Sequence, residues 1–511
     1  MGINQNSILY HSSRLAISSV LLQLLGFFYR ILLGRLAGPQ VIAVHGLVMS
    51  AYNVILAVTL TGIAFSVSRI AARYQAVGSG GSIRRLISLS LSLFLGLFAL
   101  LAIPFAFLRK EFSAVILGNQ DTAPALLLLI PCLFLTGFEN VHKAFFYGTA
   151  NTVPPMISET LEMLCRIAAA LLLFHIFPGL DISTTAALIV FGMILSEIIS
   201  SVFLTVCYRV QLPHIRGRDD IPRRIVLRDI ADMALPVSLS TLISRILSAA
   251  NTILIPRTLQ LSGLSVSESM EEFGVIFGMT LPMLMLPSAF LQPLITVLTP
   301  RFTAAHALKK PKEIRRKCAK ALHVTGLFAL PALCTIVGFG EYLAELLYHN
   351  KTAAQLLLPL AVNTFLGFYY VVCESVLEGI GQQRRSAILA VAATAFGVLL
   401  TLIFGGIFRM GIYGFLIGEL SSSAVGVLIS LIWVRRFTGL RFRFGNWLFS
   451  PLLSALSSML LVRPLFLHLC RSGVTKLLAF AFCISLMLLI YSVFIRLLGV
   501  DYPAYLKQLL T

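Results

Sequence analysis

The chain has 511 residues, of which 58% are hydrophobic and only 12% are charged. A soluble domain carries about 25% charged residues, so the composition excludes an ordinary soluble protein and indicates a polytopic membrane protein. The formal net charge is +19. What this excess of positive charge indicates depends on where the basic residues lie along the chain.

Apolar runs recur from one end of the chain to the other, each long enough at 1.5 Å per residue to cross a hydrocarbon core of about 30 Å. We predict an all-α protein with fourteen transmembrane helices. A Gly/Pro turn leads from the first run directly into the second, so we interpret the first run as an uncleaved span and not as a secretory signal. The predicted spans are residues 14–34, 41–67, 86–108, 122–146, 156–177, 184–207, 230–256, 272–299, 321–347, 354–377, 386–408, 411–434, 447–468 and 475–499.

Lysine and arginine gather on one side of this predicted topology. With an even number of spans, both termini lie on the same side of the membrane as the loops that follow the even-numbered spans. Lys143 is counted in the loop after span 4. That side holds about three times as many Lys and Arg residues as the opposite loops, which is the positive-inside signal. We therefore predict a plasma-membrane protein whose two termini lie in the cytoplasm. The basic excess can attract anionic membrane lipids, and we expect no nucleic-acid partner.

Motifs for catalysis and metal binding are absent from the sequence. The eight cysteines are scattered and form no C-x-x-C pair, and no G-x-x-x-x-G-K-[ST] loop or zinc-ligand spacing occurs. We predict neither enzyme activity nor a cofactor or bound metal.

Two pairs of helix ends suggest an internal duplication. Arg69 and Arg301 are 232 residues apart at the ends of spans 2 and 8, and Gly148 and Gly379 are 231 residues apart at the ends of spans 4 and 10. Parallel repeats of this kind are a transporter architecture with the binding site between the halves, although chance similarity of two helix ends is the alternative. The predicted divisions are an N-terminal lobe at 1–208, a basic cytoplasmic linker at 209–229, a C-terminal lobe at 230–436, and spans 13 and 14 with the tail at 437–511.

Span 5 carries a charged stripe. Glu159, Glu162 and Arg166 are spaced i, i+3 and i+7, which places them on one helix face, and Glu162 with Arg166 is a favourable i, i+4 pair. An ionisable group at bilayer depth costs from about 3 to over 10 kcal/mol, so the stripe should face water or partner helices and not lipid. Either it is a structural clamp or it lines the transport path.

Further ionisable and strongly polar residues lie at membrane depth. Arginine presents a planar fork that matches the oxygens of an anion two at a time, so cations on spans 1, 5 and 7 favour an anionic ligand. For Arg14 and Arg30 the alternative is that they are snorkelling anchors near the ends of span 1. The deep residues outside the stripe are Arg14, Gln23, Arg30, Glu139, His142, Glu197, Arg245, Asn251, Glu374 and Glu419.

Several stretches, among them "LLGFFYRILLGRLAG", "YGTANTVPPMISETLEMLCR" and "LPVSLSTLISRILSAANTILIPRTLQLSG", resemble the polysaccharide-export branch of the multidrug/oligosaccharidyl-lipid/polysaccharide (MOP) flippase superfamily. The sequence is most similar there to stage V sporulation protein B-like proteins, over spans 1 to 12. Matching positions are Gly26, Arg30, Gly62, Ser68, Gly148, Pro154, Ser158, Glu162, Arg166, Pro236, Pro282, Pro287 and Gly379. The sequence departs from the family pattern at Tyr147, Glu159, Glu378 and Gln382.

The resemblance implies two six-helix lobes around a central cavity. It also implies transport of undecaprenyl-pyrophosphate-linked saccharide, a peptidoglycan or polysaccharide precursor such as that of the spore cortex, and a lipid-tail groove at spans 13 and 14. On this hypothesis Arg14, Arg30, Arg166 and Arg245 bind the pyrophosphate. The residues that we predict to be polar cavity or coupling residues are Gln23, Glu159, Glu162, Asn251 and Glu374.

The leading hypothesis is therefore a flippase that moves its substrate from the inner to the outer leaflet by alternating access, coupled to Na⁺, H⁺ or the membrane potential. An inside-negative potential assists export of an anion by about 2.3 kcal/mol per charge per 100 mV. The alternatives are a cation-coupled multidrug exporter of the same superfamily and a non-transporting membrane scaffold for cell-wall synthesis. We expect a monomer whose partners are the lipid-linked sugar, membrane lipids and cell-wall synthases.

Overall fold

The computed structural model describes residues 5–215 and 217–499, with the side chains of residues 5–17, 290, 292–294, 296, 297 and 300 left out of that description. Its described part is helical and contains no β-strand. The α-helices are α1 (Gln5–Leu56), α2 (Gly62–Ala76), α3 (Ile83–Phe107), α4 (Arg109–Glu111), α5 (Ala123–Gly148), α6 (Val153–Ile176), α7 (Ile182–Gln211), α8 (Arg223–Leu261), α9 (Val266–Val275), α10 (Leu281–Leu284), α11 (Ser288–Ala307), α12 (Pro311–Gly338), α13 (Gly340–Tyr348), α14 (Leu357–Gly379), α15 (Gln383–Leu400), α16 (Ile412–Thr438), α17 (Ser450–Arg471) and α18 (Lys476–Leu497). π-Helical segments interrupt them at Ala57–Thr61, Phe112–Leu117, Ile276–Thr280, Thr401–Ile407 and Gly445–Phe449.

The predicted all-α membrane architecture is confirmed, and every predicted apolar run lies in a helical region. Eleven helical stretches of the described chain are long and apolar enough to cross a membrane. Three differences account for the smaller number. Spans 1 and 2 form a single stretch, Ser18–Ala76, and span 8 is broken into short helices. Span 5, which is α6, is not among the eleven because it carries three charged residues. The count of fourteen spans and the side on which the termini lie stay predictions.

Helix breaks occur at glycine and proline. Gly38 has φ 78°, a backbone conformation that favours glycine, and with Pro39 it kinks α1 between the first two predicted spans. Pro287 lies in the break between α10, which ends at Leu284, and α11, which begins at Ser288, and this break divides span 8. Span 9 was predicted as one helix to residue 347, but it ends at Gly338 and α13 follows after Phe339. The break makes the end of span 9 a separate short helix.

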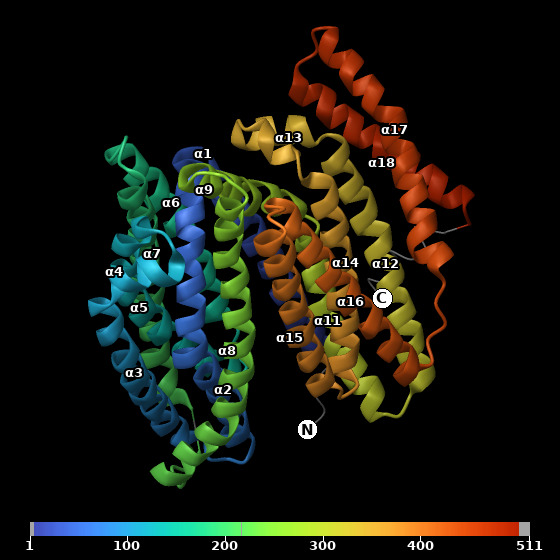
Figure 1. Ribbon diagram of the computed structural model, residues 1–511. Helices are drawn as coiled ribbons and strands as arrows, with labels where there is room; N and C mark the ends of the chain where they lie inside the picture. Colours follow the sequence, from blue (N-terminus) through green and yellow to red (C-terminus); the bar gives the residue numbers. More distant parts are fainter. Residues whose placement is uncertain (1–4, 216, 500–511) are drawn as a thin grey trace. The chain divides into compact units, whose positions relative to one another are not determined.

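One compact unit comprises Met1–Gly278 and Val398–Phe415. Within it α7 packs against α5 and α6, and α2 packs against α5 and α8, as the blue to green helices of Figure 1 illustrate. Its core includes the fully buried rings of Phe94, Phe145 and Phe146.

A second compact unit comprises Met279–Gly397 and Leu416–Thr511. In it α12 packs against α14 and α17, and α17 forms a hairpin with α18. These units differ from the predicted lobes because α8, the predicted span 7, packs in the first unit. The lobes at 1–208 and 230–436 stay a prediction about repeats in the sequence.

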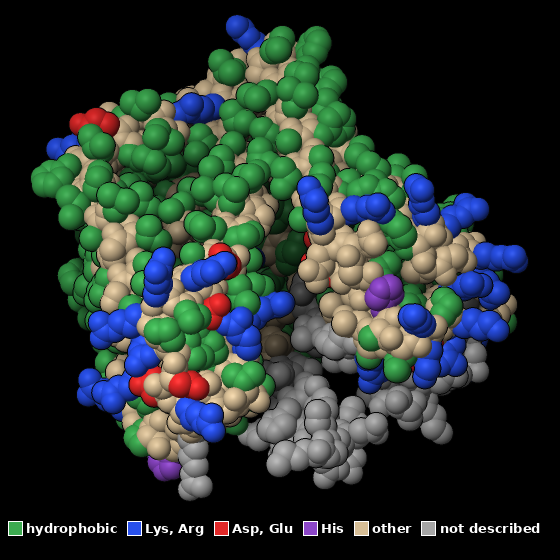
Figure 2. Space-filling view, turned by 90° about the horizontal axis from the view of Figure 1, so that it is seen from below, with side chains coloured by type: hydrophobic (Ala, Val, Ile, Leu, Met, Phe, Trp, Pro, Cys, Tyr) green, Lys and Arg blue, Asp and Glu red, His purple; other side chains and the backbone are tan. Residues whose placement is uncertain are grey.

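Basic side chains gather at one end of the helices. In Figure 2, which is seen from below, Lys and Arg side chains form clusters beside areas of hydrophobic side chains. In the second unit, the basic segments 301–320 and 435–443 meet at this end, where Gly439 lies against the Arg315 guanidinium. This clustering agrees with the positive-inside pattern of the sequence.

Equivalent glycines pack at the ends of spans 4 and 10. A methyl group on Gly148 would lie 2.6 Å from the carbonyl oxygen of Ser68, the residue before Arg69. A methyl group on Gly379 would lie 2.4 Å from Cβ of Phe302, the residue after Arg301. Each glycine therefore sits where span 4 or 10 touches span 2 or 8 of its own unit, and this repeated contact supports the internal duplication.

We predict that Gly148→Ala and Gly379→Ala each destabilise the protein by about 1–3 kcal/mol, because neither backbone-lined contact has room for a methyl group. This loss should outweigh the gain of up to about 1 kcal/mol in helix propensity. The measurement is the apparent melting temperature of purified protein in detergent.

The matched controls are Gly96→Ala in α3 and Gly367→Ala in α14, where a methyl group would meet no atom within 4 Å. They should leave the melting temperature unchanged or raise it. Equal effects at all four positions would contradict the packing argument.

Candidate functional site

The charged stripe of α6 faces helices and not lipid. Pro154 and Pro155 occupy the first turn of α6, where their missing N–H groups leave no hydrogen bond unmade. From there the stripe turns toward α5 and α7. Glu162 and Arg166 form the predicted i, i+4 ion pair, through Glu162 Oε1 and Arg166 Nη2.

Arg166 joins two helices. Its Nη2 also lies 3.6 Å from Oε1 of Glu197 on α7, and its Nε donates a hydrogen bond of 3.2 Å to Ser196 Oγ. The guanidinium therefore stands between two carboxylates.

Lys143 of α5 joins three carboxylates. Its Nζ lies 3.0 Å from Glu139 Oε1, 3.5 Å from Glu162 Oε2 and 3.8 Å from Glu159 Oε1. Glu159 also accepts a 3.4 Å hydrogen bond from the Tyr147 hydroxyl. One ammonium group thus connects the whole α6 stripe to α5.

Glu139 is the most deeply placed acid. Its side chain is 1% exposed, and its Oε1 accepts hydrogen bonds from Ser200 Oγ and, at 3.0 Å, from Ser158 Oγ. The two hydroxyls are themselves 2.5 Å apart. Helices α5, α6 and α7 each contribute one of these three groups, which fits their close packing.

We call these six ionisable residues the charge network: Glu139, Lys143, Glu159, Glu162, Arg166 and Glu197. Four acids face two bases, so the network carries a formal charge of −2 when all six are ionised. Burial rises from the Glu159 side chain, 31% exposed, to that of Glu197, 4% exposed. Low-dielectric surroundings make an uncompensated charge expensive, so the network calls for bound protons or a bound cation.

Two further observations indicate where a proton or cation could bind in the charge network. Oε2 of Glu197 is buried and has no hydrogen-bond partner among the described residues. One carboxylate oxygen from each of Glu139, Glu162 and Glu197 also lies within 4.8 Å of the others. Carboxylate oxygens at such spacing suit a hard cation or shared protons.

Helix α1 forms a fourth wall. Tyr29 and His45 lie within electrostatic reach of Arg166, and α1 packs against α6 and α7. Nδ1 of His45 is buried without a hydrogen-bond partner in the described part of the chain. Helices α1, α5, α6 and α7 of a single unit thus surround the buried part of the network, while Glu159 remains partly exposed.

Among the nine predicted site residues, the structure brings Glu159, Glu162 and Arg166 together. Arg30 on α1 and Arg245 on α8 are instead exposed and make no ion pair with a described residue. They remain available to a ligand.

The remaining predicted site residues lie apart from the network. Gln23 on α1 and Asn251 on α8 are half-buried, and Glu374 is half-buried on α14 of the second unit. Arg14 falls outside the described side chains.

The sequence prediction missed one member of the network, Lys143, and did not group two others, Glu139 and Glu197. Lys143 was counted as a loop charge, yet it lies in α5 with a side chain only 10% exposed. The i, i+4 spacing of Glu139 and Lys143 was the available signal.

Comparison with known proteins identifies the family. Residues 9–306 match the family described as polysaccharide biosynthesis protein. The chain belongs to this family. It is a multi-pass membrane protein of the MOP flippase superfamily, in the branch of stage V sporulation protein B. Residues 236–403 of this family member also match the MatE family.

Two curated relatives come from Bacillus subtilis (strain 168). Stage V sporulation protein B is 23% identical over 366 residues, which cover 70% of this chain and 70% of the relative. Sporulation protein YkvU is 18% identical over 300 residues, which cover 57% of this chain and 66% of the relative.

Solved structures share the fold. An inward-facing multidrug resistance MATE family transporter of the MOP superfamily aligns with TM-score 0.68 and 19% identity, over 83% of this chain and 98% of the transporter. A MOP superfamily transporter from Pyrococcus furiosus, described as having a binding pocket of reverse polarity, aligns with TM-score 0.63 and 19% identity, over 84% and 95% of the two chains. The polysaccharide biosynthesis protein therefore has a transporter fold.

We predict that Arg166→Met lowers stability by about 3–5 kcal/mol, because it removes the cation that pairs with buried Glu197 and leaves Glu162 with Lys143 alone. Adding Glu162→Gln should recover part of the loss. Apparent melting temperatures in detergent measure both effects.

Arg245→Met, the same substitution at an exposed and unpaired arginine, is the control and should change the melting temperature little. If Arg166→Met is as mild as this control, the network does not stabilise the fold.

Proposed function

We propose that this protein is a flippase that carries undecaprenyl-pyrophosphate-linked saccharide from the inner to the outer leaflet by alternating access. Membership of the polysaccharide biosynthesis family over residues 9–306 carries the proposal. Similarity to stage V sporulation protein B favours a cell-wall precursor as the saccharide. Synthases that make or consume this precursor are the expected partners.

Arg30 and Arg245 are the proposed pyrophosphate ligands. Both side chains are exposed, and neither is neutralised by an ion pair with a described residue. Guanidinium groups bind phosphate oxygens in pairs and replace part of the hydration that a doubly charged headgroup loses on entering the membrane. Arg14 is proposed for the same role from its position in the sequence.

Arg166 has a different environment. A pyrophosphate would have to compete with Glu162 and Glu197 for its guanidinium. We therefore assign Arg166 first to the charge network, where its position would respond to the charge state of these two acids.

The charge network is the proposed coupling element. Its formal charge of −2 supports uptake of protons or of a cation such as Na⁺, and the unpartnered oxygen of Glu197 offers a ligand atom for either. A proton or cation bound at Glu197 would weaken the ion pair between Glu197 and Arg166. The contact between α6 and α7 would change as a result. Such a two-state contact is what coupling requires.

A cation-coupled drug exporter is the second candidate. The buried acids of the network favour it, because an exporter of cationic drugs needs acids that exchange the drug for H⁺ or Na⁺. The unpaired Arg30 and Arg245 favour the flippase, since they repel a cationic drug. The substrate dependence of transport discriminates the two.

We predict that Arg30→Ala and Arg245→Ala each reduce flux of the lipid-linked saccharide at least about tenfold, because each removes a charge-assisted contact of about 1.5–3 kcal/mol. The measurement is a leaflet-accessibility assay in cells or proteoliposomes. Arg436→Ala, which removes an exposed arginine at the end of α16, is the control and should leave the flux unchanged. Wild-type flux in both Arg30→Ala and Arg245→Ala would remove these arginines from the mechanism.

Replacing Glu197 by glutamine should uncouple transport from the driving ion. We expect wild-type flux to rise with an imposed H⁺ or Na⁺ gradient and flux of Glu197→Gln to be insensitive to it, since the amide keeps the shape but not the charge. Glu271→Gln, at an exposed acid of α9, is the control. An unaltered gradient dependence in Glu197→Gln would exclude the network as the coupling site.

A further inference from the structure

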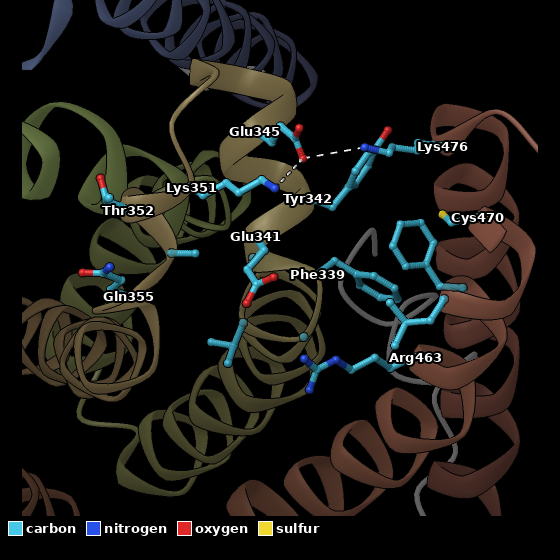
Figure 3. Close-up of a pocket in the computed structure, with 16 residues that line it drawn as sticks. Phe339, Glu341, Tyr342, Glu345, Lys351, Thr352, Gln355, Arg463, Cys470 and Lys476 are labelled. Carbon is cyan, nitrogen blue, oxygen red and sulfur yellow. Dashed lines mark ion pairs between the residues drawn. The ribbon is translucent and has the colours of Figure 1, made fainter.

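A second site lies in the second unit, away from the charge network. It is a pocket of about 580 Å³ between α13 and the segment Lys351–Ala354 on one side and α17 with the start of α18 on the other (Figure 3). The ends of spans 9 and 13 meet here, because α12 stops at Gly338 and leaves room beneath α13.

The pocket lies at the end of the helices opposite the basic loops. Helix α12 begins at Pro311 within the basic segment 301–320 and ends at the pocket, and α17 likewise follows the basic segment 435–443 and ends there. The positive-inside pattern therefore assigns the pocket to the outer face of the membrane.

Two groups of charged side chains line the pocket. At the rim Glu345 lies 3.9 Å from Lys351 and 3.8 Å from Lys476, the ion pairs drawn in Figure 3. Glu341 and Arg463 are both exposed and extend from opposite walls, and neither forms an ion pair with any described residue. Glu345 is thus paired with two lysines, whereas Glu341 and Arg463 are open to a ligand.

Arg463 is an exposed, unpaired charge within a predicted membrane span. It stands eight residues before the end of α17, about 12 Å along the helix, inside the apolar stretch Gly445–Arg471. A cation at such depth needs water or a counter-charge. Its planar fork suits a phosphate or carboxylate.

An aromatic wall completes the pocket. The Phe466 ring centroid lies 5.1 Å from that of Phe339 and 5.3 Å from that of Tyr342. The Tyr342 hydroxyl is buried and has no hydrogen-bond partner within the described residues, and Gln355 and Thr352 add an amide and a hydroxyl. Rings match the apolar face of a sugar, and these polar groups match its hydroxyls.

We infer that this pocket binds the head group of a membrane-anchored, phosphate-bearing saccharide at the outer face. Arg463 holds the phosphate, Glu341 and the Tyr342 hydroxyl hold sugar hydroxyls, and the sugar packs against the aromatic wall at Tyr342, its half-buried member. The inference rests on the proposed function in taking this saccharide to be the one delivered by the flippase. A bulk anionic phospholipid shares the phosphate but lacks the sugar.

Cys470 gives a direct readout, because its thiol is half-buried and lines the pocket. Full-length protein in nanodiscs is treated with a maleimide, and alkylation of Cys470 is followed by peptide mass spectrometry, with Cys207 in the first unit as internal reference. The probes are prenyl-pyrophosphoryl N-acetylglucosamine, the same prenyl pyrophosphate without sugar, and phosphatidylglycerol.

We expect the sugar-bearing probe to slow alkylation of Cys470 at least about fivefold, and the other two probes to slow it less than twofold. Glu341→Gln and Arg463→Ala should abolish the protection, whereas Arg471→Ala, at the end of the same helix but outside the pocket, should keep it. Arg463→Lys retains the positive charge but lacks the planar fork, so the sugar-bearing probe should protect Cys470 only weakly in this variant. This variant tests the role of Arg463 if Arg463→Ala does not fold.

Absence of protection in the wild type, equal protection by phosphatidylglycerol or by the sugarless probe, or full protection in Glu341→Gln would each overturn the inference. The flux assay on wild-type protein separates this result from the proposed function. Normal flux without protection of Cys470 would reject only the outer binding site. Absence of flux would reject the flippase function, whatever the alkylation result.

Discussion

An ionisable side chain inside a membrane protein must be paired, hydrated or neutralised, and the distribution of charge in this protein follows from that constraint. Arg166 and Lys143 are paired with acids on neighbouring helices. Arg30 and Arg245 are exposed and unpaired, and Arg463 borders a pocket. Paired charges hold helices together, and unpaired ones mark where a charged ligand is expected.

The two units share a helix junction but differ in their ionisable residues. Gly148 and Gly379 make equivalent contacts in their own units, so the same helix junction occurs twice. In the predicted duplication α15 corresponds to α6, and its sequence after Arg385 contains no acid or base. The charged stripe of α6 therefore has no equivalent on α15, and we expect the two helices to differ in their roles in transport.

Much of the fold was predictable, because apolar runs, the glycine pairs and the i, i+4 spacing of Glu162 and Arg166 are local signals. The interruptions at Phe339 and Pro287 were not predicted, since hydropathy does not register where a helix breaks. The place of Lys143 was missed for a tertiary reason: only the packing of α5 on α6 and α7 reveals three carboxylates around it. The same holds for the pocket at Arg463, which requires spans 9 and 13 to be neighbours.

The discontinuity of the first unit has a consequence for biogenesis. Its last segment, Val398–Phe415, packs on α8, where Gly405 lies against Thr258 and Gly411 against Ser262. The ribosome must therefore complete about four-fifths of the chain before this unit can close. Until then α8 lies in the bilayer without this packing partner. Insertion chaperones can bind its uncovered side during that interval.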